Sequence, residues 1–337
     1  MRLILMGTGP FAVPAFEQIY ATPHGVAALV TAPVRMHRGR AVEPPSPLRR
    51  LAGRHGTPIV DPEDINAPES QEQLRRYAAD LLVVCDYGQI LKRETLAAAR
   101  LGGINLHGSL LPKYRGAAPI NWAIYHGETE TGVTVIHMTP QLDAGPSIAR
   151  AVTPIGPEET AVELEARLAQ LAAGLVRHSL EMLEAGRVEA LPQDPALASR
   201  APRLKKTDGA IDWSRPAAAI KNQVRALEPW PKTYTFWHRR EGPPLRLILG
   251  PVRVVEPIAE WDAGGSIRHF VKGTINRELF AQPPGTVLTA ADGWLVIVAG
   301  QGAVAPLGLQ PAGKRPMTSE EFLRGHPVQP GDRFGPE

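Results

Sequence analysis

Short apolar runs alternate with amphipathic stretches through the first half of the chain, and no other feature limits its fold so strongly. Each run has the length of a strand and is bounded by turn-forming residues. Such a series of β–α–β units folds into a doubly wound, mostly parallel sheet of the Rossmann-like α/β class, with right-handed crossovers. The predicted strands are residues 3–6, 26–30, 81–85, 104–107 and 133–138. The predicted helices between them are residues 14–20, 47–54, 69–79 and 120–125.

The pattern changes in the second half of the chain. A long helix is predicted at residues 160–184, and three prolines then indicate an extended linker at 187–203. After a helix at 216–227, short β-rich segments alternate with Gly and Pro turns, which is typical of a small antiparallel β-barrel of the OB-like kind. We therefore predict one α/β domain at residues 1–186 and a β-barrel domain at 204–337. The β-rich segments are residues 245–249, 252–255, 285–288 and 294–298.

Three polar residues follow the predicted strands and suit acyl transfer. Asn105 and His107 are two residues apart on one strand, so their side chains project from the same face. Asp143 stands in a D-A-G turn after the next strand, which would let its carboxylate swing back toward the imidazole. An amide donor for an oxyanion, an imidazole and a carboxylate together fit this chemistry. Singly, each also fits a structural role, as a turn former, a buried histidine or a turn aspartate.

No covalent nucleophile accompanies these residues in the sequence. The only cysteine, Cys85, ends an apolar run, and Ser109 lacks the G-x-S-x-G surroundings of a nucleophilic serine. We therefore expect a direct attack by the substrate's own nucleophile. No metal is expected either, because His24, His37 and His55 lack a metal-binding spacing.

Composition limits the class of protein. A single cysteine among 337 residues excludes an internal disulfide framework and suits a reducing cytoplasm. No run reaches the roughly 18 apolar residues that a membrane span needs, so we expect no membrane contact. The glycine turn after the first strand, G-T-G-P, is a weak dinucleotide-binding signal, because the second strand ends without an acidic residue. We expect a cytoplasmic protein that acts as a monomer.

Positive charge is concentrated in two places. Residues 201–337 contain 18 Lys and Arg against 13 Asp and Glu, whereas residues 1–200 contain 19 against 21. The loop at residues 33–47 adds Arg35, Arg38 and Arg40 around a glycine. Either place could contact a phosphate backbone, although charge and composition alone favour a solvated surface.

Two motifs resemble the folate-dependent formyltransferases. They are I-N-L-H-G-S-L-L-P-K-Y-R-G-A-A-P-I at residues 104–120 and L-D-A-G at residues 142–145. The resemblance implies that Asn105, His107 and Asp143 are catalytic and that 10-formyltetrahydrofolate is the co-substrate. It also implies a folate pocket formed by two loops. Their residues are Asp86, Tyr87, Gly88, Gln89, Ile90, Leu91, Ser109, Leu110, Leu111 and Pro112. Asp86 departs from the family, which often has alanine there.

Further segments are similar to the members of this family that act on methionyl-tRNA. The loop at 33–47 has their R-G-R and P-S-P arrangement, and the C-terminal half shares their L-K-K-T-D-G and P-W-P segments. This resemblance implies transfer of the formyl group to the α-amine of methionyl-initiator tRNA, with a C-terminal tRNA-binding domain. Residues 258–284 are longer than the usual connection of that barrel and are assigned only as a loop. The expected tRNA contacts are Arg35, Arg38, Arg40, Lys205 and Lys206.

Two alternatives stay open at this point. The chain could formylate another amine, such as an amino-sugar nucleotide, or it could be an RNA-binding protein that keeps the fold without catalysis. The basic C-terminal half and the loop at 33–47 favour a tRNA acceptor over a smaller amine. The presence of Asn105, His107 and Asp143 argues against a protein without catalysis. Two tasks are open for Asp143, which could hold His107 in its protonated form or relay a proton through water.

Overall fold

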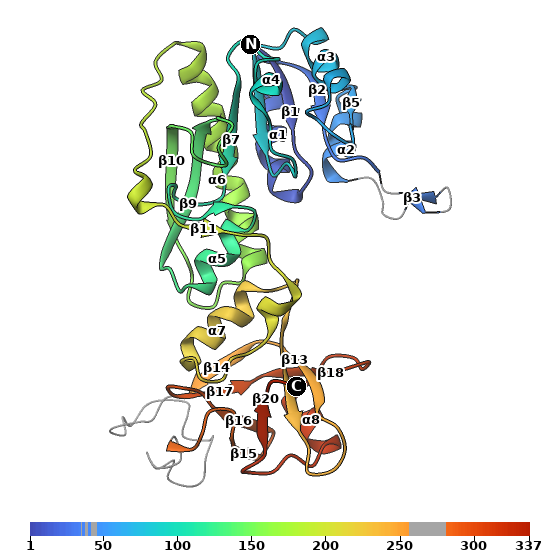
Figure 1. Cartoon of the computed structure of the whole chain (residues 1–337), viewed down its shortest axis with the longest axis vertical. Coiled ribbons are helices and arrows are strands. Elements are labelled where there is room, and N and C mark those ends of the chain that lie inside the picture. The colour runs from blue at the N-terminus through green and yellow to red at the C-terminus, as the bar shows by residue number, and fades with distance from the viewer. Residues whose placement is uncertain (35, 38–39, 42–45, 256–280) are drawn as a thin grey trace. The chain divides into compact units, whose positions relative to one another are not determined.

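A computed structural model describes residues 1–34, 36–37, 40–41, 46–255 and 281–337 (Figure 1). The chain divides into two compact units. The first contains Met1–Ala123, Thr129–Pro157 and Val162–Arg203, and the second contains Ile124–Glu128, Glu158–Ala161 and Leu204–Glu337. Residues 187–203, which we predict as a linker, are therefore part of the first unit.

A seven-stranded sheet forms the centre of the first unit, in the order β10-β9-β7-β6-β1-β2-β5. The pairs β1–β2, β1–β6, β2–β5 and β6–β7 are parallel, which confirms the predicted α/β class. The last two strands differ, because β9 runs antiparallel to β7 and β10 antiparallel to β9. The strands are β1 (Arg2–Met6), β2 (Gly25–Val30), β5 (Ile59–Val60), β6 (Leu81–Cys85), β7 (Gly103–His107), β9 (Glu130–His137) and β10 (Ser147–Pro154).

Local sequence signals explain where the helices around this sheet begin and which face of each helix is buried. Pro47 occupies the first turn of α2, where its missing N–H costs nothing, and the Ser46 hydroxyl accepts a hydrogen bond from the Arg49 amide. Along α6, Leu164, Leu168 and Leu180 recur at helical spacing and are fully buried. The helices are α1 (Val13–Tyr20), α2 (Pro47–Arg54), α3 (Pro68–Arg76), α4 (Arg93–Leu96), α5 (Pro119–Tyr125) and α6 (Ala161–Glu184).

Two short strand pairs lie outside the central sheet. In the first, β8 (Arg115–Gly116) pairs in parallel with β11 (Arg200–Ala201), which joins the loop after β7 to the segment that follows α6. The second pairs β3 (Met36–His37) with β4 (Arg40–Ala41), inside the predicted basic loop. Residues 35, 38–39 and 42–45 of that loop, which include Arg35 and Arg38, lie outside the described residues.

Antiparallel strands surround one core in the second unit. They form two sheets, β19-β18-β13-β12-β20 and β14-β17-β16-β15. Strand pairing passes from one sheet to the other where the Gly250 amide bonds to the Gly308 carbonyl, and again where Thr286 bridges Arg333. This circuit closes the strands into a barrel, as predicted. Its shared core contains Trp213 and Trp237. Of residues 258–284, those up to 280 lie outside the described part of the chain.

The elements of this barrel have the following bounds. The strands are β12 (Thr233–His238), β13 (Leu245–Leu249), β14 (Val252–Val255), β15 (Val287–Ala291), β16 (Trp294–Val298), β17 (Ala303–Pro306), β18 (Gly308–Pro311), β19 (Met317–Thr318) and β20 (Arg333–Gly335). The helices are α7 (Ala217–Ala226) and α8 (Ser319–Gly325), and α8 begins with a capping box between Thr318 and Glu321.

Candidate active site

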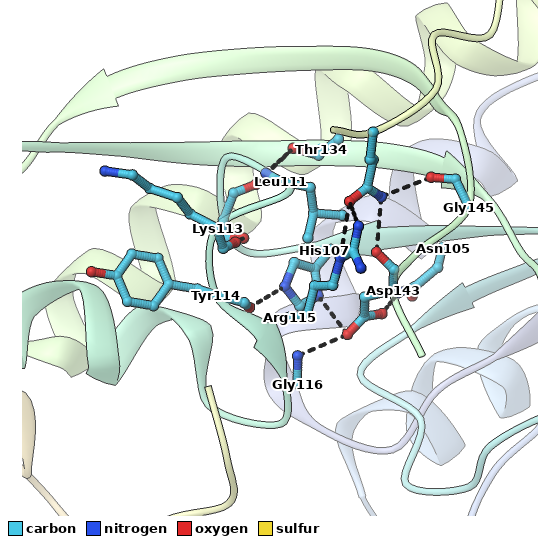
Figure 2. Close-up of polar contacts among 12 residues, drawn as sticks. Asn105, His107, Leu111, Lys113, Tyr114, Arg115, Gly116, Thr134, Asp143 and Gly145 are labelled. Atoms are coloured by element: carbon cyan, nitrogen blue, oxygen red, sulfur yellow. Dashed lines mark hydrogen bonds and ion pairs between the residues drawn. The ribbon is translucent and has the colours of Figure 1, made fainter. Parts of the chain in front are cut away.

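Asn105, His107 and Asp143 come together at the carboxyl end of β7 (Figure 2). The amide nitrogen of Asn105 donates to Oδ1 of Asp143 at 3.2 Å. On the other side of the carboxylate, Oδ2 lies 3.6 Å from Nδ1 of His107. The side chains of His107 and Asp143 are 6% and 8% exposed, so this contact is shielded from bulk water. The three residues that we single out from sequence thus form one cluster.

Asp143 reaches the cluster through an uncommon backbone conformation. Its φ of 50° lies in the left-handed region, which costs a non-glycine residue about 1 kcal/mol. This conformation aims the carboxylate at the end of β7, where Oδ2 also accepts a hydrogen bond from the Gly116 amide at 2.9 Å. Gly145 ends the turn, and a methyl group there would lie 1.7 Å from the His137 carbonyl oxygen. The glycine of the D-A-G sequence is therefore required by the close approach of the His137 carbonyl.

The tautomer of His107 follows from its second partner. Its Nε2 lies 2.8 Å from the backbone carbonyl oxygen of Tyr114, in the loop that leads into β8 (Figure 2). A carbonyl oxygen can only accept a hydrogen bond, so Nε2 must carry a proton. The Nδ1 atom therefore faces Asp143 either as a lone pair or as a second N–H. This is the nitrogen that could exchange a proton with a bound reactant.

Several residues that the sequence does not indicate hold this cluster in place. Gln193 donates from Nε2 to the carbonyl oxygens of Asp143 and Gly145, and Arg115 donates to its Oε1. Ser199 accepts a hydrogen bond from the Tyr114 amide through its hydroxyl. Gln193 and Ser199 lie in residues 187–203, which no catalytic motif marks. Their proximity depends on the β8–β11 pair.

The predicted folate loop at residues 86–91 follows β6, the strand beside β7. The Gln89 side chain ties the loop to the rest of the protein, because its Oε1 accepts a hydrogen bond from the Ile65 amide. Leu91 is buried in the core, whereas Ile90 is 59% exposed. The loop is therefore fixed to the protein through Gln89, while the apolar side chain of Ile90 stays exposed.

The second predicted folate segment, residues 109–112, is tied to the loop after β7. The Ser109 hydroxyl donates to the Lys113 carbonyl at 2.7 Å, and the Thr134 hydroxyl donates to the Ser109 carbonyl. The Leu111 amide in turn donates to the Thr134 hydroxyl at 3.1 Å. Ser109 is fully buried, so its hydroxyl fixes the loop and lacks access to a reactant.

Asp86, the first residue of the predicted folate loop, lies against the glycine turn that follows β1. Its backbone carbonyl accepts a hydrogen bond from the Thr8 amide, and a methyl group on Gly9 would lie 1.7 Å from its Oδ2. The side chain is accessible to solvent on one side, yet enough protein surrounds it for burial to raise the pKa of its carboxyl. Burial also raises the pKa of Glu165 on α6, and the charge of Asp86 adds to that shift.

The predicted tRNA contacts fall into two groups. Arg40 begins β4, but its side chain is not among those that the structure describes, and Arg35 and Arg38 lie outside the described residues. Lys205 and Lys206 are exposed at the 3-10 turn η3 (Lys206–Gly209), at the start of the C-terminal barrel. The Lys205 amide donates to Asp208 and fixes this turn.

Among the described residues, the structure contains neither a cluster of metal-ligating side chains nor a helix able to span a membrane. There, no group of three or more His, Cys, Asp or Glu side chains could hold a metal ion. No described helix combines the length and apolar character needed to cross a membrane.

Comparison with known proteins identifies the family. Residues 1–178 match the formyl transferase domain, and residues 203–327 match the formyl transferase C-terminal domain. The chain belongs to the formyl transferase family. This confirms the resemblance that the motifs around Asn105 and Asp143 indicate. Since these two domains account for most of the chain, it is a formyltransferase built on the two-domain plan of this family.

Curated relatives match the chain over nearly their whole length. The methionyl-tRNA formyltransferase of Rhodopirellula baltica is 42% identical over 347 residues, covering 99% of this chain and 96% of the relative. That of Moorella thermoacetica is 42% identical over 336 residues, covering 99% of each chain. Among solved structures, an N-formyltransferase from Helicobacter canadensis in complex with folinic acid and dTDP-3-aminofucose superposes with a TM-score of 0.62. It is 16% identical and covers 90% of this chain and 98% of its own, so this likeness shows the shared fold.

Proposed function

We propose that this formyltransferase moves the formyl group of 10-formyltetrahydrofolate to the α-amine of methionyl-initiator tRNA, for translation initiation. The convergence of Asn105, His107 and Asp143 carries the proposal, because it supplies an amide, an imidazole and a carboxylate without a covalent nucleophile. The choice of acceptor is supported by the two methionyl-tRNA formyltransferases, which match 99% of the chain.

The reaction forms one C–N bond and breaks another. The methionyl amine attacks the formyl carbon and gives a tetrahedral oxyanion, which collapses as the folate nitrogen departs. Asn105 uses one amide N–H for Asp143, so its second N–H is available to donate to the oxyanion. The amine loses a proton and the folate nitrogen gains one. The pair of His107 Nδ1 and Asp143 Oδ2 is the site where that proton would be held during transfer.

The folate co-substrate would bind beside this cluster. The loops at residues 86–91 and 109–112 follow β6 and β7. These two strands are adjacent and parallel, so both loops begin at the same edge of the sheet. The exposed Ile90 side chain would contact the pteridine ring, while the inner side of the loop stays fixed through Gln89. Asp86 would also line this pocket.

The tRNA would be bound by the two basic parts of the chain. Arg35, Arg38 and Arg40 would contact the acceptor end, and Lys205 and Lys206 would contact phosphates at the start of the 204–337 domain. We further propose that the enzyme acts as a monomer in the cytoplasm, where its single cysteine would stay reduced.

A direct assay tests the acceptor. Purified protein and labelled 10-formyltetrahydrofolate are incubated with methionyl-initiator tRNA, with uncharged initiator tRNA, and with dTDP-3-aminofucose as an amino-sugar nucleotide. We expect label only in the charged tRNA, with His107→Ala as the inactive control. Transfer to the amino sugar alone would assign the enzyme to a small-molecule acceptor, and transfer to none of the three would refute the proposed function.

A further inference from the structure

Gln193 uses all the hydrogen-bonding capacity of its amide on two elements of the active site. Its Nε2 donates to the carbonyl oxygens of Asp143 at 2.8 Å and of Gly145 at 2.7 Å. Its Oε1 accepts from Nε and Nη2 of Arg115 at 3.1 and 2.7 Å. Reversing this amide would set N–H groups against a guanidinium and an oxygen against two carbonyls, so only one orientation is possible.

These bonds act on the backbone that aims the catalytic carboxylate. The carbonyls that Gln193 holds begin and end the Asp143–Gly145 turn, whose first residue has the left-handed φ of 50°. Such a conformation persists only where the surroundings determine it. Gln193 supplies two of the bonds that do so, while Asn105 and Gly116 bind the carboxylate itself.

Arg115 connects the same turn to the partner of His107. It lies in β8 between Tyr114, whose carbonyl accepts from His107, and Gly116, whose amide donates to Asp143. The Arg115 amide donates to the Ser199 carbonyl at 2.9 Å, six residues after Gln193 in the chain. One segment after α6 therefore supports both the histidine and the aspartate.

We propose that Gln193 is a positioning residue for formyl transfer, which fixes the Asp143 carboxylate against His107 and Asn105 by holding the two carbonyls of its turn. This inference rests on the proposed function. The side-chain hydrogen bonds of Gln193 go to the backbone of the Asp143–Gly145 turn and to Arg115, not to the side chains of Asn105, His107 or Asp143, so it acts mainly through the Asp143 turn. Its loss lets the turn relax, and a shift of about 1 Å in a catalytic group lowers turnover by up to roughly a hundredfold.

Two substitutions separate the donor role of Gln193 from its shape. Gln193→Leu removes every hydrogen bond, whereas Gln193→Glu keeps the shape and the bond to Arg115 but has no N–H for the two carbonyls. We expect both variants to lower kcat by about ten- to a hundredfold with little change in the KM for folate. Gln170→Leu, on the exposed face of α6, is the matched control. If Gln193→Glu kept the wild-type kcat, the N–H donors of Gln193 would not be needed for catalysis, and the positioning role would be wrong.

A double-mutant cycle tests whether the effect passes through Asp143. In an Asp143→Asn background, Gln193→Leu should lower the residual rate by less than about threefold, because the group it positions is already disabled. An equal fold loss in both backgrounds would overturn the positioning role. If the wild-type enzyme itself fails to formylate methionyl-tRNA, the proposed acceptor is wrong, and the cycle is then measured with the acceptor that the enzyme uses.

Hydrogen exchange provides a readout that needs no substrate. The Gly116 amide is bonded to Asp143, so displacement of the carboxylate should speed its exchange in Gln193→Leu about as much as in Asp143→Ala. The Val83 amide in β6 should keep its protection as an internal control. Unchanged exchange at Gly116 in Gln193→Leu would contradict the inference whatever the acceptor proves to be.

Discussion

Nδ1 of His107 lies 3.6 Å from Oδ2 of Asp143, within ion-pair reach but beyond hydrogen-bond distance. The ring is held from its other side by the Tyr114 carbonyl, so it cannot turn toward the carboxylate without losing that bond. The carboxylate is likewise held by Asn105 and Gly116. Both partners are thus positioned by the protein before substrate binds, which is the arrangement that lowers the reorganisation needed during proton transfer.

Removing either partner should affect chemistry more than folding. We expect His107→Ala and Asp143→Ala to lower the single-turnover rate of formyl transfer by roughly a hundredfold or more, the scale for an acid–base or oxyanion group. Folate affinity, measured by titration, should change little. Near-normal single-turnover formylation by folded His107→Ala would rule out the proposed role of the imidazole.

Gly116 should tolerate no side chain, because its φ of 131° is coupled to a close strand contact. A methyl group there would lie 2.4 Å from the Ala201 carbonyl oxygen, in the β8–β11 pair. We expect Gly116→Ala to lower the free energy of unfolding by about 2 kcal/mol, as for other backbone conflicts at positive φ, and to lower activity through the lost Gly116–Asp143 bond.

Urea denaturation measures the first effect and single-turnover kinetics the second. Gly53→Ala is the control, because Gly53 lies in α2 with open space around it and alanine favours a helix. Equal stabilities for the two variants would mean that the β8–β11 contact is readily rearranged.

The carboxyl of Asp86 should make stability depend on pH. Burial raises its pKa, so the folded state binds this proton more tightly than the unfolded chain does. The ionised group therefore costs stability at pH values above the raised pKa, and the cost disappears as the pH falls below the unfolded value of about 3.9. Asp86→Asn should raise the melting temperature at pH 8, and the gain should shrink toward pH 4.

Thermal unfolding between pH 4 and pH 8 gives this comparison. Glu189→Gln, at an exposed position, controls for the loss of one negative charge. If Asp86→Asn gave the same change in melting temperature at every pH, ionisation of Asp86 would have no part in its effect.

Local sequence patterns are enough to predict most of the fold and the three residues at the centre of the site. The helix at Pro47–Arg54 and the strand at Leu81–Cys85 have the bounds that the sequence predicts, because capping residues and apolar runs are local signals. The two-residue spacing of Asn105 and His107 likewise fixes their common face. Antiparallel β10 is not predicted, since it is an edge strand with half-exposed residues and lacks a buried run.

The supporting residues could not be predicted for a different reason. Gln193 is 50 residues from Asp143 and 78 from Arg115 along the chain. These contacts exist only once β8 and β11 have paired, and a glutamine after a proline carries no local signal for such a role. The sequence therefore indicates the reacting groups, while the residues that orient them emerge only from the tertiary structure.

The C-terminal barrel should bind tRNA through its cations. If Lys205 and Lys206 each contact a phosphate, the slope of log affinity against log salt should fall by about one for each contact removed in Lys205→Gln/Lys206→Gln. Folate affinity should stay unchanged, because this change lies in the other structural unit. The variant Lys205→Arg/Lys206→Arg keeps both charges and should keep the wild-type slope. Filter binding of methionyl-initiator tRNA over a range of salt concentrations measures the slopes, and a tRNA affinity that does not respond to salt would exclude phosphate contacts as the source of binding.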